Sequence, residues 1–347
     1  MSTNRITVVL SQTRSKNPEK RRLEEDIATA LLLEPGIEFA VVPNVYDLSP
    51  GDTGLLYLSS VKSHLVLLSW QYPRAAHWLL DRNGISGNQG TTLLKSLGEE
   101  ADDEETGGED EEAPRGIGPV ETLDRFIFCL DLRAYDDANV YVEEIKRIAK
   151  EASIKIVSLT GPTTDPSMDW IQGSPKPEQL QRFLSLEKSG ARLTVLGEAK
   201  GNRWYPVIDY SRCTNCLECI DFCLFGVYGV DRKDRILVEN QDNCKRGCPA
   251  CSRVCPENAI IFPEHKTPAI AGAPGEGPGG LKIDLSKLFG APSAIELAAM
   301  ERDVELVRDG RAAVGLTVGI PKRQTGKDAA EKDELDKLMD ELDNLEI

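Results

Sequence analysis

"CTNCLECIDFC", residues 213–223, contains four cysteines that are separated by two, two and three residues. A second run, CKRGCPACSRVCP at residues 244–256, contains four more, so eight of the nine cysteines fall between residues 213 and 255. Thiolates in groups of four bind zinc or iron–sulfur clusters, because both are soft metal centres. Outside an oxidising compartment, such clustering favours metal binding over disulfides. The two runs therefore predict a metal centre.

The spacing of the cysteines favours iron–sulfur clusters over zinc. Structural zinc sites usually take their ligands from two separated pairs of cysteines. Three cysteines at two-residue spacing instead form one loop around a cubic cluster, and the fourth cysteine of the run ligates the other cluster of a pair. Two [4Fe–4S] clusters are the favoured interpretation. One cluster with a degenerate second site, and a zinc site, are the alternatives.

Residues 204–265 resemble the bacterial ferredoxins that hold two [4Fe–4S] clusters. The resemblance rests on both cysteine runs, on Pro256 after the last cysteine, and on short strand-like segments. These segments are residues 207–209, 227–230, 236–238 and 259–261. The resemblance implies an α+β domain in which each run provides ligands to both clusters. The implied ligands are Cys213, Cys216, Cys219 and Cys255 for cluster 1, and Cys223, Cys244, Cys248 and Cys251 for cluster 2.

The sequence departs from this ferredoxin pattern at two points. Leu224 follows Cys223, where the family usually has proline, and three residues instead of two separate Cys244 from Cys248. We expect Gly247 to accommodate the extra residue, because glycine adopts backbone conformations that other residues avoid. If the second departure matters, it affects the cluster that Cys244 would bind.

Residues 1–200 alternate strand-like and helix-like segments. The strand-like runs are short and almost continuously apolar, and the helical segments between them are amphipathic. This pattern predicts an α/β domain of three layers, with an open, mostly parallel sheet between helices. One helix is expected to begin at Asn17-Pro18. The strand-like runs are Thr7–Leu10, Ile37–Val42, Leu65–Trp70, Phe126–Leu132 and Ile154–Leu159.

The segment SQTRSKN, residues 11–17, follows the first predicted strand and leads into the first helix. In open parallel sheets, this is a place where anions bind. The segment resembles the flavodoxin phosphate loop, although Arg14 stands where that loop has glycine. Ser11, Thr13 and Ser15 are therefore candidate residues for binding an anion or the phosphate of FMN. We favour a structural turn over a flavin site.

The net charge of −16 is concentrated in two segments. Residues 99–112 contain ten acidic and no basic side chains, and residues 331–347 contain eight acidic and two basic ones. Because the rest of the chain is balanced in charge, the sequence gives no basic surface for nucleic acid. It contains no apolar run long enough to span a membrane and no signal peptide, so we expect a cytoplasmic protein.

Composition also predicts the remaining organisation. The acidic run marks residues 97–118 as a disordered insertion in the α/β domain. Glycine and proline mark residues 266–280 as a flexible linker, and residues 281–347 follow as a flexible, acidic and partly helical tail, with one helix expected at Ser293–Arg308. Leucines at three- and four-residue spacing give the helix at 333–347 an apolar stripe, which packs either on its own protein or on a partner.

Three functions remain compatible with the sequence. The favoured one is an electron-transfer protein, a carrier or redox subunit that passes single electrons between a donor and a partner docked on the α/β domain. The second is an oxidoreductase whose N-terminal domain binds flavin or substrate and receives electrons from the clusters. The third is an iron–sulfur module with a structural or sensing role. The sequence assigns no catalytic residue, and the presence of flavin would separate the second function from the first.

Overall fold

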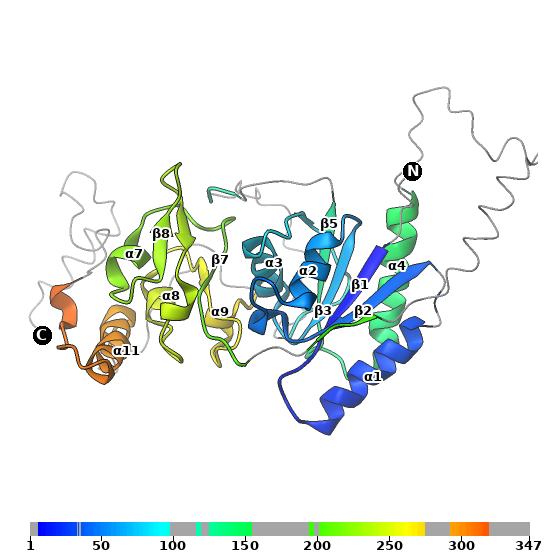
Figure 1. Cartoon of the computed structure of the whole chain (residues 1–347), viewed down its shortest axis with the longest axis horizontal. Coiled ribbons are helices and arrows are strands. Elements are labelled where there is room, and N and C mark those ends of the chain that lie inside the picture. The colour runs from blue at the N-terminus through cyan, green and yellow to red at the C-terminus, as the bar shows by residue number, and fades with distance from the viewer. Residues whose placement is uncertain are drawn as a thin grey trace, which may run out of the picture. The chain divides into compact units, whose positions relative to one another are not determined.

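The computed structural model describes residues 6–32, 34, 36–97, 116–118, 125–154, 194–197, 201–274 and 292–318. These residues form two compact units (Figure 1). Unit 1 draws its described residues from the ranges 1–111, 119–203 and 266–275. Unit 2 draws its own from 112–118, 204–265 and 276–347.

Unit 1 is built on a six-stranded sheet in which every pairing is parallel. The strand order is β4-β5-β3-β1-β2-β6. The strands are β1 (Ile6–Ser11), β2 (Ile37–Val42), β3 (Leu65–Ser69), β4 (Asn88–Gln89), β5 (Phe126–Asp131) and β6 (Thr194–Val195). The predicted open parallel sheet is confirmed. The edge strands β4 and β6 are not evident from the sequence, because two residues are too few to show a pattern.

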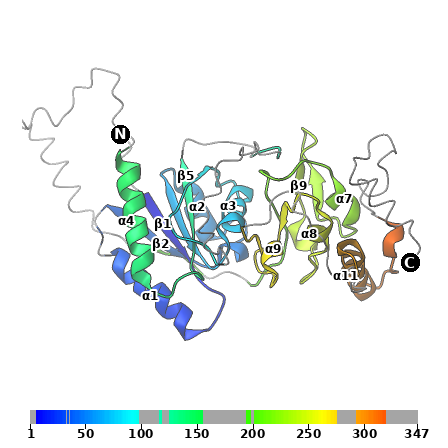
Figure 2. The same ribbon diagram turned by 180° about the vertical axis from the view of Figure 1, so that it is seen from behind.

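Helices cover both faces of this sheet (Figures 1 and 2). The helices α1 (Pro18–Leu32) and α4 (Ala138–Ile154) lie side by side on one face, and α2 (Thr53–Ser60) and α3 (Pro73–Arg82) lie on the other. Ile27 of α1 and Ile145 of α4 belong to the same buried apolar cluster as Val8 and Leu10 of β1. The helix start predicted at Asn17 is confirmed, since the Asn17 side chain accepts a hydrogen bond from the Glu19 amide.

The strand order changes direction at β1, because β2 pairs with one edge of β1 and β3 pairs with the other. The helix α1 connects β1 to β2 on one side, and α2 precedes β3, which pairs with β1 on the other side. In open α/β sheets, the crevice at the carboxyl end of such a switch point is where ligands bind. The loop at residues 12–17 and the short helix η1 (Val45–Asp47) follow the carboxyl ends of β1 and β2.

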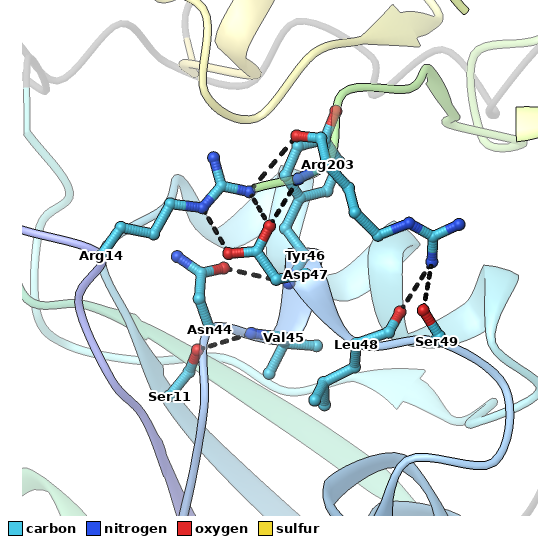
Figure 3. A network of polar contacts seen from close by, with 9 residues as sticks. All are labelled: Ser11, Arg14, Asn44, Val45, Tyr46, Asp47, Leu48, Ser49 and Arg203. Carbon is cyan, nitrogen blue, oxygen red and sulfur yellow. Dashed lines mark hydrogen bonds and ion pairs between the residues drawn. The ribbon is translucent and has the colours of Figure 1, made fainter. Parts of the chain in front are cut away.

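The buried carboxylate of Asp47 organises this edge of the sheet (Figure 3). It accepts hydrogen bonds from Nε and Nη2 of Arg14, at 2.6 and 2.5 Å, and a third from the backbone amide of Arg203, at 2.7 Å. The Arg203 guanidinium in turn donates to the carbonyl oxygen of Leu48, at 3.0 Å. Asp47 therefore links the loop that follows β1 to the segment that ends at Arg203.

A second buried carboxylate, that of Glu24 on α1, contacts the loop at residues 12–17. Its Oε1 accepts hydrogen bonds from the Thr13 amide, at 2.5 Å, and from the Trp70 indole, at 2.8 Å. Burial raises the pKa of Glu24 above its usual value, although both hydrogen bonds oppose the rise. The hydrogen-bond acceptor of the Thr13 amide is therefore a side chain of the protein itself, the Glu24 carboxylate.

Unit 2 contains two antiparallel pairs of short strands. The strand β7 (Val207–Ile208) pairs with β10 (Ile260–Ile261), and β8 (Tyr228–Val230) pairs with β9 (Ile236–Val238). These four strands confirm the strand-like segments expected from the sequence. The helices α7 (Glu218–Phe222) and α8 (Ala250–Val254) each lie at the end of a cysteine run, and η2 (Gln241–Asn243) precedes the second run.

A longer helix, α11 (Ala294–Arg308), completes unit 2 and confirms the helix predicted there. Its first turn is closed by a capping box, in which Ser293 and Glu296 each bond the backbone amide of the other. Ala298 of α11 packs with Ala250 and Val254 of α8 in one buried cluster. The helix is followed by η3 (Gly315–Thr317).

Several predictions concern residues outside the described ranges. These are most of the acidic insertion, all but the first residue of the strand expected at Ile154–Leu159, and the apolar helix at 333–347. Ile154 itself is the last residue of α4 and not part of a strand. The segment expected to be a linker begins with a short helix, α9 (Pro268–Ala271), on which Ile270 is buried. None of the helices in the described ranges has the length and apolar character needed to cross a bilayer.

We expect Asp47→Ala to lower the free energy of unfolding of unit 1 by about 3 kcal/mol, because it leaves Arg14 and the Arg203 amide without this buried carboxylate. Asp26→Ala is the matched control, since the Asp26 side chain is 58% exposed and lies 3.8 Å from Arg22 on the surface of α1. Exposed ion pairs contribute less than about 1 kcal/mol. Urea unfolding followed by circular dichroism measures both losses, and equal losses would contradict the special role of Asp47.

We expect the difference in stability between Glu24→Gln and the wild type to shift in favour of the variant as the pH rises. The folded-state pKa of Glu24 lies above its usual value of 4.5, so this side chain contributes most below pH 4.5 and loses that contribution as the pH rises through its folded-state pKa. Urea midpoints from about pH 4 to about pH 7 measure the trend. The exposed Glu25→Gln serves as control, and a flat profile for both variants would refute the expectation.

Candidate metal centre

The structure brings Cys213, Cys216, Cys219 and Cys255 together, although they come from different cysteine runs. Burial raises the pKa of Cys213 to about 11, and the nearby charges of Cys255 and Cys216 add to the rise. Burial likewise raises the pKa of Cys219, again with contributions from Cys255, Cys213 and Cys216. The fourth cysteine of the second run is therefore within electrostatic range of the first three cysteines of the first run.

The other four cysteines line one small cavity of about 20 Å³. They are Cys223, Cys244, Cys248 and Cys251. Apart from these thiols the lining is mainly apolar and includes Phe222 and Val227, with the side chains of Lys245 and Arg302 also present. Burial raises the pKa of Cys251, and the charge of Cys223 is the next contribution to the rise. The fourth cysteine of the first run therefore lies among the first three of the second.

The two short helices explain how the cysteine runs cross. The helix α7 carries Cys219 in its first turn and is followed at once by Cys223, and α8 carries Cys251 and is followed at once by Cys255. The Cys223 amide donates to the carbonyl oxygen of Cys219, at 3.1 Å, so one turn of helix separates the two residues. Because α7 packs on α8, each helix contributes thiols to both groups of cysteines.

The loop of the first cysteine run contains two residues in the left-handed backbone conformation. Asn215 has a φ of +58° and Leu217 a φ of +63°. The Asn215 side chain donates to the carbonyl oxygen of Asp234, at 2.8 Å, and accepts from the amide of Ile236, at 2.9 Å. These bonds fix the loop to the β8–β9 hairpin. Such conformations turn successive backbone N–H groups inward, toward bound anionic groups.

The extra residue of the second run is accommodated at Gly247, as expected. Gly247 has a φ of +86°, in the left-handed region that favours glycine. Here the chain turns before Cys248 and α8. The surrounding space holds no heavy atom within 4 Å of the place where a Cβ would stand, so the backbone angle and not crowding is what requires glycine.

Backbone N–H groups face several of the buried thiols. The amide of Ala259 donates to Sγ of Cys255, at 3.3 Å. Burial raises the pKa of Cys223, and the amides of Phe225, Val227 and Gly226 partly oppose the rise. Hydrogen bonds of this kind stabilise thiolate sulfur and are one of the means by which proteins tune iron–sulfur clusters.

Both groups of thiols fit the chemistry of a [4Fe–4S] cluster. A cluster of this type takes four cysteine thiolates, one at each iron of a cube, so its ligands do not need to meet at one point. In the described part of the chain, no three Cys, His, Asp or Glu side chains converge as a single metal ion would require. Each group instead contains four cysteines, and those of the second group line the cavity described above.

Two further side chains at the site were not identified from the sequence. Tyr228 is buried, and its hydroxyl lies 3.1 Å from Sγ of Cys251. Burial raises the pKa of Tyr228, with further contributions from Cys251, Cys219 and Cys223, so this ring lies near thiols of both groups. Arg302 lines the cavity described above. No spacing marks Tyr228, whereas Ala298, Arg302 and Leu306 share one face of α11 by their four-residue spacing.

The candidate anion loop is folded through its own hydroxyl groups. Ser11 Oγ accepts from the amide of Val45, at 3.0 Å, Thr13 Oγ1 from the amide of Ser15, at 3.1 Å, and Ser15 Oγ from the amide of Asn17, at 3.1 Å. With the Thr13 amide bonded to Glu24, these contacts form a closed turn.

The ninth cysteine, Cys129, is buried on β5 in the sheet of unit 1.

Three known proteins are similar to part of this chain. An uncharacterized ferredoxin of Methanocaldococcus jannaschii is 50% identical over 66 residues, which are 19% of this chain and 44% of that ferredoxin. The pyruvate synthase subunit PorD of Methanothermobacter marburgensis is 31% identical over 87 residues, which are 23% of this chain and 100% of that subunit. The PorD subunit of Methanocaldococcus jannaschii is 36% identical over 55 residues, 16% of this chain and 62% of that subunit.

These similarities concern a minor part of the chain, and the chain spans less than half of the first relative. No family profile and no solved structure matches it. The remaining residues, including the parallel sheet of unit 1, are without an assigned family. The PorD subunit of Methanothermobacter marburgensis is nevertheless covered over its whole length. Through its cysteine-rich region, the chain therefore belongs to the ferredoxin family that includes the pyruvate synthase subunit PorD.

Proposed function

We propose that the chain is an electron-transfer protein with two [4Fe–4S] clusters, which passes single electrons between a donor and a partner docked on unit 1. Cys213, Cys216, Cys219 and Cys255 would hold cluster 1, and Cys223, Cys244, Cys248 and Cys251 would hold cluster 2. The observation that carries this proposal is the single cavity lined by four cysteines from two separate runs. Crossed ligation of this kind is characteristic of two-cluster ferredoxins.

When bound, each cluster accepts and releases one electron at a potential set by charge, hydrogen bonds and solvent. The chain's own residues provide these conditions. The apolar lining around Phe222 and Val227 limits the access of water to the thiols of cluster 2. The amides around Cys223 and the amide of Ala259 supply hydrogen bonds to sulfur. All eight cysteines of the two runs serve as ligands in this proposal.

Tyr228 supports a close approach between the two sites. Its buried ring lies near Cys219, a ligand of cluster 1, and near Cys223 and Cys251, ligands of cluster 2. The crossing at α7 and α8 has the same effect, because each helix carries ligands for both clusters. With both clusters bound, an electron that entered at one site would have a short route to the other.

The relatives support a role within a larger redox complex. Two of them are named as subunits of pyruvate synthase, so that protein functions as one part of an enzyme. We propose by analogy that this chain is a redox subunit or carrier whose partner binds unit 1.

An oxidoreductase with its own flavin or substrate site is the alternative. The strand order β2-β1-β3-β5 favours it, because flavodoxin-like sheets place FMN at the switch point between the first and third strands. The Glu24 carboxylate beside the Thr13 amide weighs against it, since this carboxylate would repel a phosphate. The flavin content of the protein distinguishes the two functions.

Protein purified without oxygen tests the proposed function directly. We expect about eight irons and about eight sulfides per chain, no flavin, and a visible absorption that bleaches reversibly with dithionite. One flavin per chain would favour the alternative function. Zinc in place of iron, or clusters that break on reduction, would contradict the proposal of electron transfer.

Single substitutions test the crossed ligation. Cys216→Ala should damage cluster 1 and Cys223→Ala should damage cluster 2, although only seven residues separate them in the sequence. Electron paramagnetic resonance of the reduced variants should show the loss of different signals, and the iron content should fall by about half in each case. Cys129→Ala is the matched control and should retain the full iron content. Loss of the same signal in both cluster variants would refute the crossed arrangement.

A further inference from the structure

Arg302 is the largest fully buried side chain among the described residues, with 1% of its surface exposed. Its guanidinium lies 4.3 Å from the centre of the Phe222 ring. It donates to the carbonyl oxygens of Gly315, at 2.5 Å, and Val318, at 2.9 Å, and approaches that of Phe222, at 3.5 Å. A buried cation is costly unless its donors are satisfied, so the fold holds this charge in a defined position.

The position of this charge is the cavity that contains the thiols of cluster 2. Arg302 lines that cavity together with Cys223, Cys244, Cys248 and Cys251. The neighbouring Phe222, whose ring Arg302 contacts, comes directly before Cys223 and lines the same cavity. The partners of Arg302 are mostly neutral carbonyls, so its positive charge is only partly compensated inside unit 2.

The acidic side chains around α11 limit this effect without cancelling it. The nearest is Asp303, whose Oδ1 lies 3.3 Å from Nε of Arg302 and whose side chain is 15% exposed. Glu301 and Glu305 of the same helix are paired with other arginines, Glu301 with Arg253 and Glu305 with Arg308. Asp303 is less buried than Arg302, and solvent therefore screens its charge more strongly.

We propose that Arg302 raises the reduction potential of cluster 2, so that α11 is a redox-tuning element of the ferredoxin unit. This inference rests on the proposed function, because it requires that the four thiols hold a cluster. Uptake of one electron adds one negative charge to the site. A fixed positive charge in a poorly polarisable environment stabilises that added charge, and the reduced form becomes easier to reach. Arg302 acts on the cluster site through the electrostatic field of its charge and is not a ligand.

Redox titration of the anaerobically purified full chain, with dithionite as reductant, tests the proposal. Arg302→Gln removes the charge and should lower one of the two potentials, with about a tenfold change in the ratio of reduced to oxidised sites, or about 59 mV for one electron. Arg302→Lys retains the charge and should restore most of the wild-type potential. Arg308→Gln is the matched control on the same helix, because the Arg308 side chain is 68% exposed and should change neither potential.

Asp303→Asn keeps the test decisive if the Arg302 variants do not fold. Oδ2 of Asp303 accepts from the amide of Gly315, at 2.6 Å, and an asparagine oxygen can replace this acceptor. Loss of the compensating negative charge should raise the same potential that Arg302→Gln lowers. Loaded protein in which Arg302→Gln and Asp303→Asn leave both potentials unchanged would overturn the role of Arg302 alone. Protein that contains no iron–sulfur cluster would overturn both this inference and the proposed function.

Discussion

The two thiol groups of unit 2 depend on the packing of α7 against α8. Each helix begins near the third cysteine of its run and ends just before the fourth, so one helical turn separates thiols that belong to different groups. Neither group is complete unless both helices are in place. The antiparallel pairs β7–β10 and β8–β9 hold the ends of the two runs, and the left-handed residues Asn215 and Leu217 shape the loop between the ligands. The architecture of this unit therefore follows from a single requirement: each of the two cysteine runs must contribute thiols to both groups.

Buried thiolates require compensation of their negative charge, and unit 2 supplies it in three ways. Backbone amides face the thiols of Cys223 and Cys255. The Tyr228 hydroxyl lies within hydrogen-bonding distance of Cys251. A cationic side chain acts on each group: Arg235 lowers the pKa of Cys213 against the effect of burial, and Arg302 does so for Cys223. The two buried carboxylates of unit 1 have different partners. Asp47 forms an ion pair with Arg14, whereas Glu24 accepts hydrogen bonds from the Thr13 amide and the Trp70 indole.

The sequence predicted the parts of this structure that depend on local pattern. The parallel sheet followed from apolar runs between amphipathic helices, and a helix was expected at Ser293–Arg308, where α11 lies. The pairing of β7 with β10 could be expected only through the resemblance to ferredoxins, since it joins segments about fifty residues apart. The edge strands β4 and β6 carry too few residues for a periodic signal.

The contributions of Asp47 and Arg302 could not be predicted from the sequence, because they depend on tertiary contacts. Asp47 meets Arg203 across 156 positions of the chain, and no local pattern marks either residue as a partner of the other. The four-residue spacing of Ala298, Arg302 and Leu306 places Arg302 on one face of α11, but only the packing of α8 against α11 shows that this face is buried. The candidate anion loop at residues 11–17 shows the same limit, since the position of Glu24 beside Thr13 is set by how α1 returns along the sheet.

The place of α11 in the chain has a consequence for biosynthesis. The eight cysteines lie between residues 213 and 255, whereas Arg302 is synthesised almost fifty residues after the last of them. A chain that grows from its N-terminus therefore exposes all eight of these thiols before the helix that lines the cavity of Cys223, Cys244, Cys248 and Cys251 has left the ribosome. For that interval the cavity lacks one wall, which would give an assembly factor access to the thiols. The same helix later separates that site from water and from oxidants, so cofactor insertion and protection would be ordered in time by the direction of translation.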